Sequence, residues 1–145
     1  MGTRSNIGIL NKDGSVEIIY CHFDGYLSHN GKILNEHYKN VPKVRKLISL
    51  GDISSLAPEI GRKTSFDDPR DGQVVAYGRD RGENDVDARR YSSYDDYWAT
   101  IWDDRWIEFI YIFIPSANFE PNIVLPTFSN HEIILSSTWS SLCFT

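Results

Sequence analysis

One stretch decides the fold: Trp106-Ile107-Glu108-Phe109-Ile110-Tyr111-Ile112-Phe113-Ile114, the strongest strand pattern in the chain. β-Branched and aromatic residues fill it, and these residues favour strands. Alternation places Ile107, Phe109, Tyr111 and Phe113 on one face, and Trp106, Ile110, Ile112 and Ile114 on the other, beside Glu108. Two apolar faces are typical of a strand at the centre of a sheet that is covered on both sides. The stretch therefore predicts a central strand.

A β-hairpin is predicted near the N-terminus. Two apolar, β-branched runs at 7–10 and 16–23 flank the turn sequence Asn11-Lys12-Asp13-Gly14, and its glycine accepts a positive φ. Alternation along the second run puts His22 and Asp24 on the same face, near the end of the strand. We expect this hairpin to share one sheet with the central strand.

Three helices are predicted, and the first two are expected to cover one face of the sheet. Residues 28–39 carry an apolar stripe at helical spacing. Pro42 suits the first turn of a second helix. Gly51 can adopt the left-handed backbone conformation that ends this helix. A third helix starts at a serine cap, Ser92 or Ser93, and runs to Trp102.

The remaining segments are shorter. They predict a turn or 3₁₀ piece at 52–56, an irregular loop at 58–72, a short strand at 73–77, a solvated loop at 78–90 and a final hairpin from 123–125 and 133–135. The expected fold class is therefore α+β. It comprises a small, mostly antiparallel sheet with an N-terminal hairpin, helices packed on it, and a C-terminal β-rich extension.

Composition indicates one folded domain. The chain has 145 residues, 41% of them hydrophobic and 13% aromatic, which is enough for one packed core and argues against disorder. The absence of an eighteen-residue apolar run predicts no membrane span. The start of the chain lacks the apolar core of a secretion signal, and two cysteines are too few for a disulfide scaffold. We expect reduced thiols and a cytoplasmic location.

Charge is unevenly placed along the chain. The formal net charge of −5 disfavours nonspecific binding to nucleic acid. Every lysine and arginine lies at or before Arg105, and residues 115–145 carry almost no charge. This shift predicts a compact domain over 1–114, followed over 115–145 by a β-rich tail or an extension of the same domain. A β-branched tail at a sheet edge invites pairing, so it either closes that edge or mediates a homo-oligomer.

The first candidate site follows the hairpin, in Tyr20-Cys21-His22-Phe23-Asp24-Gly25-Tyr26. His22 and Asp24, with His37 from the first helix, are candidates for a divalent metal site or an acid/base pair. In the plainer interpretation, His22 bonds backbone at a strand end and His37 completes an amphipathic face. The spacing supplies no clear fourth ligand, so no metal and no cofactor are expected. Alternation also separates Cys21 from His22, which makes Cys21 a buried structural thiol.

The second candidate site is the charged turn Gly78-Arg79-Asp80-Arg81-Gly82-Glu83, at the exit of a strand. The forked guanidiniums of Arg79 and Arg81 are suited to clasping a phosphate or a carboxylate. In the plainer interpretation, the arginines pair locally with Asp80, Glu83 and Asp85 in a solvated loop. Both interpretations remain open at the level of sequence.

An aromatic face on the third helix has two interpretations. Its members are Tyr94, Tyr97, Trp98 and Trp102. Such a face stacks on a base or fills a protein groove, or it packs into the core against the central strand. The interleaved acids disfavour nucleic acid, which makes core packing the expected role.

Several segments together resemble a known group of proteins. They are Thr3-Arg4-Ser5-Asn6-Ile7-Gly8-Ile9, Tyr20–Tyr26, His37-Tyr38, Leu50-Gly51-Asp52-Ile53-Ser54-Ser55-Leu56 and Ala76-Tyr77-Gly78-Arg79-Asp80-Arg81-Gly82-Glu83. The chain resembles a family of small, uncharacterised bacteriophage and prophage proteins with a Thr-Arg-Ser start and a Cys-His-Trp-Asp-Gly-Tyr-Pro turn. Here Phe23 stands in place of the tryptophan and Leu27 in place of the proline. The resemblance covers residues 3–113 and carries over no catalytic residues.

The resemblance implies a phage accessory protein that acts in the bacterial cytoplasm. Small accessory proteins of this sort often bind and inhibit a component of host defence. The leading hypothesis is therefore a non-enzymatic interaction protein whose partner is a bacterial host protein. Its surface is expected to combine two neighbouring segments: His22, Asp24 and Tyr26, with His37 nearby, and Arg79, Asp80, Arg81 and Glu83. The alternatives are a protein that binds a small anion or nucleotide through Arg79 and Arg81, and a metal-dependent hydrolase built on His22, Asp24 and His37.

Overall fold

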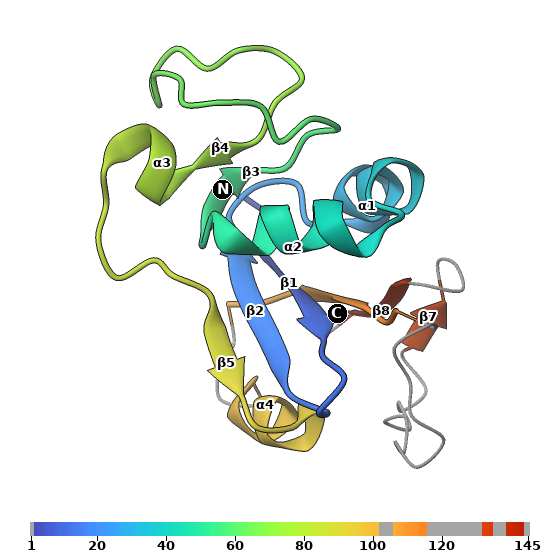
Figure 1. Cartoon of the computed structure of the whole chain (residues 1–145). Helices are drawn as coiled ribbons and strands as arrows, with labels where there is room; N and C mark the ends of the chain where they lie inside the picture. The colour runs from blue at the N-terminus through green and yellow to red at the C-terminus, as the bar shows by residue number, and fades with distance from the viewer. Residues whose placement is uncertain (1, 102–105, 116–131, 135–138, 144–145) are drawn as a thin grey trace.

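The fold is a mixed sheet with helices on both faces (Figure 1). The computed structural model describes residues 2–101, 106–115, 132–134 and 139–143. Its strands are β1 (Ser5–Leu10), β2 (Val16–Cys21), β3 (Ile53–Ser55), β4 (Val75–Ala76), β5 (Arg89–Tyr91), β6 (Phe109–Phe113), β7 (Glu132–Ile134) and β8 (Trp139–Cys143). Its helices are the π-helical turn η1 (Leu27–Gly31), α1 (Lys32–His37), α2 (Val41–Ser49), α3 (Tyr77–Arg81) and α4 (Tyr94–Ile101). The α+β class is confirmed.

The sheet runs in the order β4-β3-β2-β1-β6-β8-β7 across the described strands, and β5 pairs with β2 beside this path. The predicted hairpin is confirmed: β1 and β2 are antiparallel, with Ser5 opposite Cys21 and Leu10 opposite Val16. Gly14 turns the hairpin with φ 88°. The predicted central strand is confirmed as well, because β6 lies between β1 and β8 and is parallel to β1.

Two separate apolar cores cover the two faces of the sheet. The first core packs α1 and α2 on the sheet; its buried residues include Ile7, Ile9, Ile19, Leu34, Tyr38, Val44, Leu47, Ile53, Tyr111, Phe113 and Trp139. The second core packs α4 on the opposite face; its buried residues are Leu10, Val16, Ile18, Tyr94, Tyr97, Ile101, Ile107, Ile110 and Ile112. Side chains of β6 thus alternate between the cores, which confirms the two apolar faces over Phe109–Phe113. The predicted face of Ile107 is wrong: it lies in the second core, because the regular alternation begins only at Phe109. The aromatic face of α4 is core packing in its described members.

The helices form where the sequence places them, with one difference. At the start of α2 the Asn40 side chain accepts a hydrogen bond from the Lys43 N–H at 2.9 Å, and Gly51 follows the helix with φ 75°. At the start of α4 the Ser93 hydroxyl accepts from the Asp96 N–H at 3.1 Å. The segment 28–39 divides into η1 and α1, because a π-helical turn at 27–31 precedes the α-helix. No helix in the described part of the chain is both long and apolar enough to cross a membrane.

Three short elements correct the prediction. Residues 52–56 contain β3 rather than a turn or 3₁₀ piece, because Ile53 pairs with Cys21 on one side and Ala76 on the other. The predicted loop at 78–90 contains most of α3 and begins β5. The regular strand at 106–114 starts later than predicted, at Phe109, and Trp106 is 68% exposed. Tertiary pairing decides the short strands β3 and β5, and such pairing overrides local composition in short segments.

The described part of the C-terminal segment belongs to the sheet. β8 pairs antiparallel with β6, and β7 pairs antiparallel with β8. Ile133 and Ile134 therefore join a hairpin whose other strand is β8, not the predicted partner at 123–125, which lies outside the described residues. Trp139 is buried in the first core.

Replacing Gly51 by alanine is expected to lower the free energy of unfolding by about 2 kcal/mol. Gly51 has a positive φ, and a Cβ there would lie 2.2 Å from the Val86 carbonyl oxygen. Gly14→Ala is the matched control, because Gly14 has a similar φ but no atom within 4 Å of the added Cβ. It is expected to cost about 1 kcal/mol, from backbone strain alone. Urea denaturation of both variants measures the difference, and equal losses would show that the contact with Val86 carries no energy.

Candidate functional site

The predicted turn after β2 is held by backbone contacts to its neighbours. The His22 N–H donates to the Ile53 carbonyl at 3.1 Å, and the Phe23 N–H donates to the Ser54 carbonyl at 3.0 Å. His22 Nδ1 lies 2.8 Å from the Tyr20 hydroxyl, as expected for two side chains on one face of a strand. Asp24 then adopts a left-handed backbone with φ 58°. The turn thus projects its side chains from the end of the sheet.

The thiol beside this turn is structural. Cys21 is fully buried in the first core. The Asn30 amide donates to its sulfur at 3.3 Å and also to the Phe23 carbonyl at 3.2 Å, so Asn30 ties η1 to the end of β2. Burial raises the pKa of the Cys21 thiol to about 11, although its hydrogen bonds with the Asn30 amide and the Phe23 backbone oppose the shift. A thiol with so high a pKa is protonated at neutral pH and is a poor nucleophile.

His22, Asp24 and His37 have separate partners. The Asp24 carboxylate lies 4.0 Å from His29 Nε2, and His37 Nε2 lies 3.8 Å from the Glu36 carboxylate at the end of α1. Within the described residues no group of three histidine, cysteine, aspartate or glutamate side chains could hold a metal ion. The predicted trio is therefore not brought together as a metal-binding group.

Arg79 and Asp80 form a buried structural pair. The Asp80 carboxylate has no exposed surface and accepts from the backbone N–H groups of Thr64 and Ala76, at 3.0 and 2.8 Å. Arg79 donates to the same carboxylate at 3.0 and 3.1 Å, and to the carbonyls of Ile60 and Val74 at 2.8 and 2.6 Å. This pair fastens the 60–76 loop to α3. Arg79 is used within the fold and does not face a ligand.

Arg81 and Glu83 lie on the surface beside this pair. Their side chains form an ion pair at 2.9 Å, and both are substantially exposed. The Arg81 guanidinium also lies 4.4 Å from the centroid of the Phe66 ring and 5.1 Å from that of Tyr77. The plainer interpretation of the charged turn, local ion pairing, describes these contacts. The two arginines do not converge on one anion.

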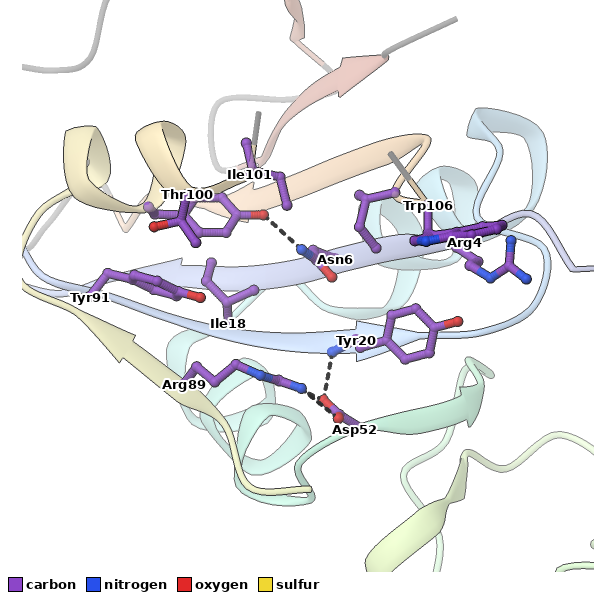
Figure 2. A pocket seen from close by; sticks show the side chains of 12 residues that line it. Arg4, Asn6, Ile18, Tyr20, Asp52, Arg89, Tyr91, Thr100, Ile101 and Trp106 are labelled. Carbon is purple, nitrogen blue, oxygen red and sulfur yellow. Dashed lines mark hydrogen bonds and ion pairs between the residues drawn. The ribbon is translucent and has the colours of Figure 1, made fainter. Parts of the chain in front are cut away.

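A cavity that the described residues line lies elsewhere, on the face of the sheet that carries the second core. It has a volume of about 390 Å³. Figure 2 shows how side chains from β1, β2, β5 and α4 surround it. Its lining residues are Arg4, Asn6, Ile18, Tyr20, Asp52, Arg89, Tyr91, Tyr97, Thr100, Ile101, Trp106 and Ile107. We call this space the sheet-face cavity.

Asp52 and Arg89 form one wall of the sheet-face cavity. The Arg89 guanidinium donates twice to the Asp52 carboxylate, at 2.9 and 2.6 Å, in a bidentate pair. The Tyr20 N–H donates to the same carboxylate at 2.9 Å. Burial raises the pKa of the Asp52 carboxyl above its usual value, while Tyr20 and Arg89 oppose the rise. The pair closes the space between β2, β3 and β5 and leaves part of Arg89 exposed.

Asn6 forms the floor of the sheet-face cavity. It is a buried polar residue in the middle of the sheet, and its Nδ2 donates to the Tyr97 hydroxyl at 2.9 Å. Burying an amide costs free energy unless its polar atoms find partners. Figure 2 places Asn6 between Tyr91 on one side and Arg4 with Trp106 on the other.

Arg4 and Trp106 form an aromatic and basic end of the sheet-face cavity (Figure 2). The Arg4 guanidinium carbon lies 5.2 Å from the centroid of the Trp106 ring, in cation–π geometry. Trp106 is one of three large apolar side chains exposed among the described residues, with Phe23 at 42% and Tyr26 at 40%. Strand register places Phe23 and Trp106 at one end of the sheet, because Ser5 pairs with both Cys21 and Phe109. Tyr26 lies at the same end, because the N–H of the preceding Gly25 donates to the Thr3 carbonyl at 2.8 Å. We call Phe23, Tyr26 and Trp106 the aromatic end.

Sequence reasoning named part of these surfaces and missed the cavity. It selected Tyr26 and the turn that carries Phe23, but not Arg4, Asn6 or Arg89. A signal was present in Asn6, an amide side chain directly before the apolar residues of β1. The partners of Asn6 come from segments far apart in the chain, so spacing alone could not assemble them.

Comparisons of the chain with protein-family models, with curated proteins and with solved structures found no match.

Proposed function

We propose that the chain is a non-enzymatic phage accessory protein that binds a bacterial host protein, a component of immune defence, in the bacterial cytoplasm. The aromatic end is the contact surface. The phage origin and the host target rest on the resemblance of the Thr3–Ile9, Tyr20–Tyr26 and Ala76–Glu83 segments. The single structural observation in support is that the exposed large apolar side chains of the described residues gather at one end of the sheet.

The composition of the aromatic end is typical of protein interfaces. Aromatic residues and arginine are enriched at such interfaces, and tryptophan, tyrosine and arginine dominate their binding energy. Phe23 and Tyr26 lie on the turn after β2, and Trp106 lies just before β6 with Arg4 against its ring. Two polypeptide segments, rather than one mobile loop, therefore support the surface.

The basic group at the aromatic end indicates the chemistry of the partner. Arg4 has no carboxylate within 4 Å among the described residues, whereas Arg79, Arg81 and Arg89 each have one. This surface is complementary to a partner with an acidic side chain opposite Arg4. Beside that side chain, the partner would have an apolar depression that receives the aromatic rings. Electrostatic complementarity of this kind adds specificity and speeds association.

The test is affinity capture from host cells followed by titration of the captured protein. We expect the full chain to capture a host protein in stoichiometric amounts. Phe23→Ala and Trp106→Ala should each weaken binding by about tenfold or more, because they remove exposed aromatic anchors. Lys12→Ala is the control: Lys12 is exposed in the hairpin turn at the opposite end of β1, so this variant should bind as the unmodified chain does.

Two results would overturn the proposal. One is capture of a partner whose affinity is the same for the Phe23, Trp106 and unmodified chains. The other is the absence of a stoichiometric partner in every host that the phage infects. Thermal melting of each variant separates lost binding from lost folding, and unchanged melting is expected because the rings are exposed.

A further inference from the structure

We propose that the sheet-face cavity binds a nucleotide, that is, a flat heteroaromatic ring that carries a phosphate. This inference goes beyond the proposed function and does not depend on it. The site also differs from the Arg79–Arg81 turn, whose guanidiniums are occupied by contacts within the protein. Three properties of the cavity support the assignment: its size, its charge and its polar floor.

Size and walls suit a small planar ligand. The volume of about 390 Å³ lies within the range of roughly 300–1,000 Å³ that is usual for small-molecule sites. Tyr20, Tyr91 and Trp106 contribute aromatic rings to the lining, and Ile18 and Ile101 contribute apolar surface. Aromatic side chains stack on bases with little dependence on base identity.

The charge of the lining favours an anion. Among the described lining residues are two arginines, Arg4 and Arg89, and one acid, Asp52, which gives these residues a summed charge of +1 in a chain whose net charge is −5. Arg89 uses two of its N–H groups on Asp52, and a guanidinium has five. Arg4 has no carboxylate within 4 Å among the described residues. Guanidinium groups bind phosphate with directional, charge-assisted hydrogen bonds.

The floor offers the hydrogen bonds that a base edge requires. Asn6 is 8% exposed, and within the described residues its side chain makes one hydrogen bond, from Nδ2 to Tyr97. Its carbonyl oxygen and second amide hydrogen remain as an adjacent acceptor and donor. An asparagine amide presents this same pair to the edge of adenine in nucleic-acid complexes. In Figure 2 the ring would lie over Asn6, with the phosphate toward Arg4.

Calorimetric titration of the full chain with the four ribonucleoside 5′-monophosphates tests the assignment. We expect at least one of them to bind with a dissociation constant below about 1 mM. Inorganic phosphate alone and the matching nucleoside alone should each bind at least about tenfold more weakly, because each lacks half of the contacts. Failure of all four nucleotides to bind, or equal affinity for inorganic phosphate, would overturn the proposal.

Paired variants locate the binding. Arg4→Ala should weaken nucleotide binding by about tenfold or more, since it removes the charge opposite the phosphate. Arg90→Ala is the matched control, because Arg90 neighbours Arg89 on β5 but pairs with Asp13 and Glu17 outside the cavity. Phe23→Ala, at the aromatic end but outside the cavity, should also leave nucleotide binding unchanged. Binding that survives Arg4→Ala undiminished would place the nucleotide elsewhere.

Discussion

Replacing Trp139 by alanine is expected to lower the free energy of unfolding by about 3–5 kcal/mol. Trp139 is 1% exposed in the first core, and its ring packs edge-on against Phe113 with centroids 5.1 Å apart. Its indole N–H donates to the Tyr38 carbonyl at 2.8 Å, which ties β8 to the end of α1. The loss combines a large cavity with an unpaired buried carbonyl. Urea denaturation followed by circular dichroism measures it.

Trp139→Phe separates the two contributions. It keeps an aromatic ring in the core and removes the donor to Tyr38, so we expect it to cost less than Trp139→Ala. An alanine variant within about 1 kcal/mol of the unmodified chain would show that the C-terminal segment is dispensable for folding. Self-association through the same segment stays a separate proposal, and light scattering of the folded Phe variant tests it by particle mass.

Replacing Asp80 by alanine is expected to cost about 3–5 kcal/mol, because it leaves the Arg79 guanidinium buried without its counter-charge. The carboxylate accepts four hydrogen bonds, from Arg79 twice and from Thr64 and Ala76 once each. Asp71→Ala is the control, since Asp71 is an exposed carboxylate in the preceding loop. Thermal and urea denaturation at pH 7 should show a large loss for the first variant and almost none for the second.

The same carboxylate is expected to make stability depend on pH. Burial alone would raise the pKa of Asp80, but the hydrogen bonds from Arg79, Ala76 and Thr64 outweigh burial and lower it. The folded pKa is therefore below the unfolded value of about 3.9. Its contribution is complete above the unfolded pKa and is lost as the pH falls through the folded pKa. Asp80→Asn should remove this part of the acid sensitivity, and an unchanged acid profile would contradict the assignment.

The predictable part of the fold is the part with strong local patterns. The hairpin follows from two β-branched runs around Asn11–Gly14, and α2 follows from Pro42, an apolar stripe and Gly51. β6 follows from a run of apolar side chains on both of its faces. β3 and β5 do not, because each has three residues and owes its conformation to pairing with β2. Such pairing partners lie far apart in the sequence, so the periodicity of apolar residues does not reveal them.

The candidate sites divide in the same way. The Tyr20–Tyr26 turn was identifiable, because polar and aromatic residues cluster there within seven positions. The role of Arg79 was not, since its partners include the carbonyls of Ile60 and Val74, which sequence does not mark as acceptors. The proposed pairing of the turn with the Arg79–Glu83 segment stays a prediction.

The parallel pairing of β1 with β6 has a consequence for synthesis on the ribosome. β1 can pair with β2 after only a short turn. The other edge of β1 is bonded only after β6 has been synthesised, because Ser5 pairs with Phe109 there. The hydrogen bond from the Trp139 indole to the Tyr38 carbonyl forms later still, because 101 positions in the sequence separate the two residues. Contacts between such distant segments slow folding, because the entropy of closing a long loop is lost before the contacts form. The hairpin therefore leaves the ribosome before the partner strands of either of its edges, and the described sheet is complete only when β8 has emerged.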